Sequence, residues 1–77
     1  MKISDEIINA FYSGKRSDEI KFCVNDTVEI IEGQNVGVFG SVISIISLEP
    51  EVIYLIENGE TGFDLNIQQN HLKLYIE

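Results

Sequence analysis

Few side chains in this 77-residue sequence could carry out chemistry, since it holds one cysteine, Cys23, and one histidine, His71. An imidazole beside a thiol would make a nucleophile, and the two would meet if the first and last strands of a sheet paired. No known nucleophile motif surrounds Cys23, and no second cysteine or histidine stands at metal-ligand spacing. We therefore expect a buried Cys23, a solvent-facing His71, and no catalytic residue, metal or cofactor.

Carboxylates, by contrast, are plentiful. The chain has 13 acidic residues against five lysines and arginines, a formal charge of −8. Residues 1–22 are neutral, whereas residues 23–77 hold Lys73 as their one base. Paired acids of the glycosidase type need a cleft, for which a chain of this length leaves little volume. The acids therefore indicate either a solvated surface or a docking surface for a basic protein partner.

Five residues are the candidates for contacts with that partner. Four are acids on or beside the first strand and around a later hairpin, and the fifth is an aromatic residue between two glycines. They are Glu29, Glu32, Phe39, Glu57 and Glu60. We expect Phe39 to be exposed or half-exposed, as an interface anchor, and the alternative is that it plugs the mouth of a barrel.

The first 22 residues predict a short helix and a connector. Ser4 is a suitable N-cap, Gly14 a suitable stop, and the residues from Ile7 to Phe11 form an amphipathic stripe. A helix of about ten residues is unstable alone, so we expect it to pack on the rest of a single domain. Residues 15–22 form the connector.

From Asn25 onward the hydrophobic period changes to two, which indicates strands. We expect them at residues 27–30, 41–48, 52–57, 62–67 and 71–76, with one helical turn at 68–70. Asn58 and Gly59 both tolerate a positive φ and predict a hairpin turn. Five short strands are typical of a small barrel or sandwich.

The first strand and the loop after it carry a spaced set of apolar residues and glycines. These are Val28, Ile30, Gly33, Gly37, Gly40, Val42 and Ile45. This spacing resembles the KOW motif of SH3-like barrels, with Gly33, Gly37 and Gly40 as structural loop glycines. The resemblance implies that residues 23–77 form a five-stranded SH3-like barrel, and it implies nucleic-acid or ribosome binding.

The charge argues against that implied function, because a phosphate backbone is bound by lysine and arginine. We therefore expect a non-catalytic, acidic protein-binding module. Its format is similar to that of small bacterial immunity and antitoxin proteins that block cationic toxins, and an accessory subunit of a larger complex is equally compatible. The alternative is a KOW-type nucleic-acid or ribosome-associated protein, which would need a basic patch from Lys2, Lys15, Arg16 and Lys21.

The sequence also bears on the compartment. No apolar run approaches the roughly 18–20 residues that span a bilayer, and the acids after Lys2 do not fit a secretory signal. A single cysteine excludes an intramolecular disulfide. We expect a cytoplasmic protein that does not bind membranes.

Overall fold

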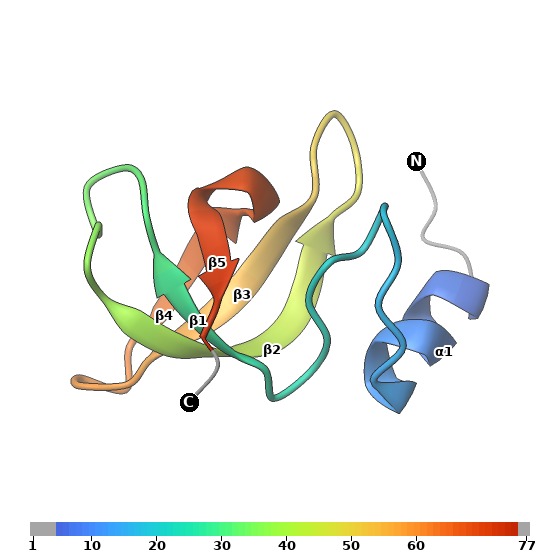
Figure 1. The fold of residues 1–77 in the computed structure, drawn as a ribbon, viewed down its shortest axis with the longest axis horizontal. Coiled ribbons are helices and arrows are strands. Elements are labelled where there is room, and N and C mark those ends of the chain that lie inside the picture. Colours follow the sequence, from blue (N-terminus) through green and yellow to red (C-terminus); the bar gives the residue numbers. More distant parts are fainter. Residues whose placement is uncertain (1–4, 76–77) are drawn as a thin grey trace.

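The computed structural model describes residues 5–75 (Figure 1). Its elements are α1 (Asp5–Ser13), β1 (Thr27–Ile30), β2 (Phe39–Ser47), β3 (Ile53–Asn58), β4 (Asp64–Gln68), the 3-10 turn η1 (Gln69–His71) and β5 (Leu72–Leu74). This confirms the prediction of a mainly β chain with one N-terminal helix, five strands and a helical turn before the last strand. The predicted cap at Ser4 and the predicted strand residue Ile76 lie outside the described residues. Within the described part, no helix is long and apolar enough to cross a membrane.

Helix α1 ends where the sequence predicts. The N–H of Lys15 donates to the carbonyl of Ala10 (2.9 Å) and the N–H of Gly14 to that of Phe11 (3.5 Å). These two bonds close the last turn in the way that a glycine directly after a helix favours. The Phe11 carbonyl also accepts a bond from the N–H of Val24 (3.3 Å), which ties the helix end to the connector.

The five strands form one antiparallel sheet in the order β4-β3-β2-β1-β5. Because β1 pairs with both β2 and β5, the first and last strands lie side by side. β2 contains two register shifts, between Val42 and Ser44 and between Ile45 and Ser47. Such bulges bend a strand, and β2 is strongly curved in Figure 1. β4 and β5 are the two edges, so the sheet is not closed into a barrel across residues 5–75.

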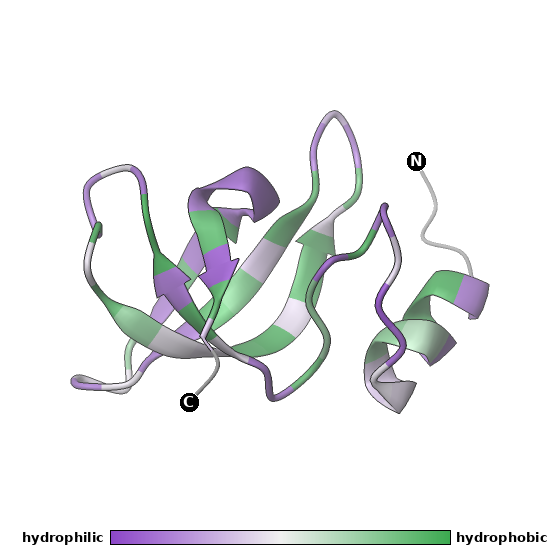
Figure 2. Ribbon diagram, viewed as in Figure 1, coloured by the Kyte–Doolittle hydropathy of each residue, from purple (hydrophilic) through white to green (hydrophobic). Residues whose placement is uncertain are grey.

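The core lies between one face of this sheet, α1 and the connector. Strand alternation places the apolar residues on that face, as the alternating colours along the strands in Figure 2 show. Tyr54 is at its centre, with Phe11 stacked at 6.3 Å and Phe22 edge-on at 5.7 Å between ring centroids. The buried cluster comprises Phe11, Ile20, Phe22, Val28, Ile30, Val42, Tyr54, Ile56, Ile67 and Leu72.

A polar network joins the connector to the sheet beside this core. The hydroxyl of Tyr54 donates to Oε1 of Gln69 and accepts a bond from the N–H of Phe22 (3.3 Å). The same Gln69 oxygen accepts from the N–H of Lys21 (2.8 Å), and Nε2 of Gln69 donates to the carbonyl of Glu19 (3.1 Å). Burial raises the pKa of Tyr54 to about 12, so the hydroxyl stays protonated as a donor.

The predicted loop glycines have two different roles. Gly33 and Gly37 lie in the β1–β2 loop with φ of +93° and +92°, a conformation that glycine adopts without strain. Gly40 is not a loop residue, so that part of the prediction is wrong. It lies within β2, where a Cβ would stand 2.5 Å from the carbonyl oxygen of Glu57 and 2.6 Å from Cγ2 of Ile56. Close approach of β2 and β3 therefore requires glycine there.

The β3–β4 turn is located where Asn58 and Gly59 predict it, but its backbone differs from the prediction. Neither residue has a positive φ, which falls on Gly62 instead. The side-chain oxygen of Asn58 accepts bonds from the N–H groups of Glu60 (2.8 Å) and Thr61 (3.4 Å). Asn58 thus stabilises a longer turn through its side chain.

Candidate functional site

Cys23 and His71 do not come together. Cys23 is buried between the connector and β1, where its N–H donates to the carboxylate of Asp26 (2.8 Å). His71 lies beyond the other end of β1, and its carbonyl accepts a bond from the N–H of Ile31 (2.8 Å). The four-residue strand β1, about 13 Å long at about 3.3 Å per residue, therefore lies between the backbone of Cys23 and that of His71. The pairing of the first and last strands therefore makes no thiol–imidazole pair.

The surroundings of these two residues do not favour nucleophilic or metal chemistry. Burial, and then the charge of Asp26, raise the pKa of the Cys23 thiol, which reduces the thiolate that a nucleophile needs. Nε2 of His71 is 3.5 Å from Oε2 of Glu32, on an exposed part of the β1–β2 loop. Across residues 5–75, no group of three or more histidine, cysteine, aspartate or glutamate residues is placed to hold a metal ion.

The sheet face opposite the core, which we call the outer face, gathers most of the candidate contact residues. In an antiparallel sheet, residues directly opposite each other project to the same face. The register aligns Asp64 with Glu57, Glu57 with Ser41 and Ser41 with Thr27. In a second row, Phe39 faces Glu29, which faces Lys73. With Tyr75, the part of the outer face that carries these residues comprises Thr27, Glu29, Phe39, Ser41, Glu57, Asp64, Lys73 and Tyr75; Leu55 and Asn66 face each other on the same side of the sheet, farther along β3 and β4.

An aromatic pair dominates this face. The rings of Phe39 and Tyr75 meet edge to face, with centroids 5.1 Å apart and an interplanar angle of 81°. Phe39 is 42% exposed and Tyr75 is 43% exposed. Phe39 is therefore half-exposed as predicted, and the alternative of a barrel plug is wrong. The pair reaches across β1, so each ring holds the other in place and leaves an apolar surface open to solvent.

Four of the five predicted contact residues lie near one another. Glu29 is directly opposite Phe39, and Glu57 is on the same face one strand farther on. Glu60 belongs to the β3–β4 turn, which is held against Phe39 by a bond from the N–H of Gly59 to the Phe39 carbonyl (2.9 Å). Glu32 lies apart in the β1–β2 loop beside His71, because the chain leaves the sheet after β1.

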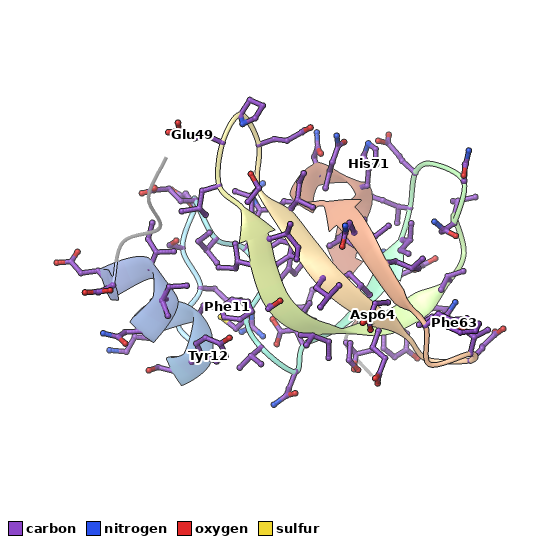
Figure 3. All side chains as sticks on the ribbon, turned by 180° about the vertical axis from the view of Figure 1, so that it is seen from behind. Phe11, Tyr12, Glu49, Phe63, Asp64 and His71 are labelled. Carbon is purple, nitrogen blue, oxygen red and sulfur yellow. The ribbon has the colours of Figure 1, made fainter. Side chains whose placement is uncertain are left out.

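The five predicted contact residues do not include three exposed residues on or beside this surface: Tyr75, Asp64 and Phe63. The alternation of Leu72 and Leu74 predicts the outward direction of Tyr75. Its contact with Phe39 depends on the pairing of β1 with both neighbours. Phe63 is 74% exposed, and Figure 3 shows it beside Asp64 at the end of the molecule farthest from α1.

The basic residues of the connector do not all remain available for a phosphate chain. The Arg16 guanidinium donates to the carboxylate of Asp26 from Nε (3.1 Å) and Nη2 (2.6 Å). Such bidentate pairing neutralises the Arg16 charge within the fold. Lys15 and Lys21 are exposed, and Lys2 lies outside the described residues.

No protein-family model matches this chain, and no curated protein or solved structure is significantly similar to it.

Proposed function

We propose that this protein is a non-catalytic binding module whose outer face docks a basic segment of another protein. The observation that carries the proposal is the half-exposed Phe39–Tyr75 pair, with the carboxylates of Glu29, Glu57 and Asp64 on the same face. Interfaces draw most of their energy from a few aromatic anchors, and charges around the anchor set specificity and association rate. The aromatic pair supplies the anchor, and the acids select a cationic partner.

The fold that we infer for this module is a partly open SH3-like barrel of the KOW type. Three features support it: the pairing of β1 with β5, the strong bend in β2, and the 3-10 turn directly before the last strand. The loop glycines Gly33 and Gly37 of the KOW-like spacing have positive φ, which is compatible with their role as loop glycines. Fold resemblance alone does not carry the function.

The net charge of −8 supports a partner that is strongly basic. Complementary fields accelerate association and are screened by salt. The acidic charge would benefit an inhibitor of a cationic enzyme, such as an immunity or antitoxin protein, mainly through rapid association. It would benefit an accessory subunit mainly through specificity for its partner. A nucleic-acid partner is less well supported, because the outer face presents three carboxylates against Lys73.

A defined probe tests the proposal: a synthetic twelve-residue peptide rich in lysine and arginine, titrated at 20 and 300 mM salt. We expect binding that weakens at least tenfold at the higher salt. The Phe39→Ser/Tyr75→Ser double variant should lose at least tenfold in affinity. Tyr12→Ser, which removes an exposed aromatic ring on α1, is the matched control and should bind normally.

Charge-reversal variants distinguish the effect of charge on the outer face from the effect of the net charge of the protein. Glu57→Lys and Glu6→Lys change the net charge equally, but Glu57 is on the outer face and Glu6 is on α1. We expect Glu57→Lys to weaken peptide binding several-fold more than Glu6→Lys. Equal effects, or tighter binding of a single-stranded RNA oligonucleotide than of the peptide, would overturn the proposal.

A further inference from the structure

A small crevice opens between α1 and the β2–β3 turn, in a part of the molecule that the outer face does not include. Its volume is about 210 Å³, and its lining residues are Ile7, Glu19, Ile20, Leu48, Glu49 and Val52. Four of these are aliphatic and two are exposed glutamates. Figure 3 shows Glu49 at the tip of the β2–β3 turn, with its side chain on the side on which α1 lies.

The walls of the crevice are held in place by hydrogen bonds. Gln69 donates from Nε2 to the carbonyl of Glu19 (3.1 Å) and from its N–H to the carbonyl of Val52 (2.8 Å). Within the β2–β3 turn, the Ser47 hydroxyl donates to the carbonyl of Glu49 (2.9 Å). The backbone at Glu19, Glu49 and Val52 is therefore positioned before any ligand arrives, which lowers the entropic cost of binding.

The size of the crevice restricts what it can accept. Pockets for cofactors and drug-sized molecules have volumes of about 300–1,000 Å³. The crevice, at about 210 Å³, lies below that range, which suits one long side chain. Aliphatic walls with two glutamates suit an aliphatic stem that ends in a cation. Lysine buries its four-carbon stem in this way and keeps its ammonium group at the polar edge.

We propose that this crevice is a receptor for a single lysine side chain of the basic partner. The stem packs on Ile20, Leu48 and Val52, and the ammonium group lies between the carboxylates of Glu19 and Glu49. This inference rests on the proposed function for the identity of the partner as a basic protein. It adds a second contact, on a different surface, that recognises one residue type.

Two small probes test the crevice directly: N-acetyl-lysine methylamide and N-acetyl-norleucine methylamide. They share the same backbone and stem and differ in the ammonium group. Titration is followed through the NMR methyl signals of Ile20, Leu48 and Val52. We expect the lysine probe to shift these signals and to bind at least threefold more tightly than the norleucine probe.

The glutamates are tested by charge-matched double variants. Glu19→Gln/Glu49→Gln should abolish the preference for the lysine probe. Glu57→Gln/Glu60→Gln removes two carboxylates elsewhere and should leave the preference unchanged. Amide spectra that match the wild-type spectrum show that each variant is folded. Equal affinities for the two probes, or an unchanged preference in Glu19→Gln/Glu49→Gln, would overturn the inference.

These experiments distinguish failure of the crevice inference from failure of the proposed function. If the basic peptide needs Phe39 and Tyr75 but the lysine probe leaves the crevice signals unmoved, the proposed function stands and the crevice inference fails. If the lysine probe binds in the crevice and the Phe39→Ser/Tyr75→Ser variant binds the peptide normally, the crevice inference stands and the outer face is not the docking surface.

Discussion

Removal of the Tyr54 hydroxyl tests how the connector is joined to the sheet. Tyr54→Phe keeps the ring that stacks with Phe11 and contacts Phe22. It deletes one donor, to Gln69, and one acceptor, from the N–H of Phe22. The packing of the core is therefore conserved and only the polar contacts change.

The magnitude follows from which groups lose their partner. Oε1 of Gln69 still accepts a bond from the N–H of Lys21, so it remains satisfied. The N–H of Phe22 loses its acceptor in a buried position, which costs about 1–3 kcal/mol. We expect the free energy of unfolding to fall by about 2 kcal/mol. For a domain of this size, that lowers Tm by about 8–16 °C, at about 4–8 °C per kcal/mol.

Urea unfolding followed by circular dichroism measures this change. The m-value should be unchanged, because the surface exposed on unfolding stays the same. Tyr12→Phe is the control, since the side chain of Tyr12 is exposed, and it should change the free energy of unfolding by less than about 0.5 kcal/mol. A Tyr54→Phe/Gln69→Leu cycle should show a coupling energy of about 1 kcal/mol.

Equal stability of Tyr54→Phe and Tyr12→Phe would contradict this assignment of the hydrogen bonds. If Tyr54→Phe were as stable as Tyr12→Phe, the hydroxyl would not be satisfying the Phe22 N–H. The bonds of Gln69 to Lys21 and Glu19 would then be the polar contacts that hold the connector to the sheet at this point.

Three further predictions concern pH, backbone packing and thiol reactivity. Burial raises the pKa of the Tyr54 hydroxyl from 10 to about 12. Its contribution to the free energy of unfolding is therefore complete below pH 10 and is lost as the pH rises from 10 through 12. Over this pH range, the urea midpoint should fall more steeply in wild type than in Tyr54→Phe. Gly40→Ala should lower the free energy of unfolding by more than about 2 kcal/mol, because the new Cβ would contact the carbonyl of Glu57. Gly37→Ala, which is strained only by its positive φ, should lower it by about 1–2 kcal/mol. Equal decreases of the two variants in thermal melts would contradict this prediction. Cys23 is buried and the pKa of its thiol is raised. The native protein should therefore react with iodoacetamide at least tenfold more slowly than glutathione does. Comparable rates for the two thiols would contradict the burial of Cys23.

The local elements of this protein follow from its sequence. The amphipathic spacing up to Phe11 and the stop at Gly14 predict α1, which the structure places at Asp5–Ser13. Alternation around Val28 and Ile30 predicts β1, and the Val- and Ile-rich segment after Gly40 predicts most of β2. These signals are local, because helix and strand periods are set by backbone geometry over a few residues.

The sequence also determines the charge of the surface. Nine acids against Lys73 in residues 23–77 exclude a basic groove in that part of the chain, whatever its fold. The density of carboxylates is a property of composition, and it favours a cationic partner whatever the arrangement of the strands.

Tertiary structure alone decided which of these residues become neighbours. Phe39 meets Tyr75 because β1 pairs with both β2 and β5, and Glu32 lies apart because the chain leaves the sheet after β1. Gly40 is required by the approach of β3, and Glu19 and Glu49 share a crevice because Gln69 holds the connector near the β2–β3 turn. Each of these contacts joins segments far apart in sequence, and register and packing are cooperative properties of the whole sheet that no local period encodes.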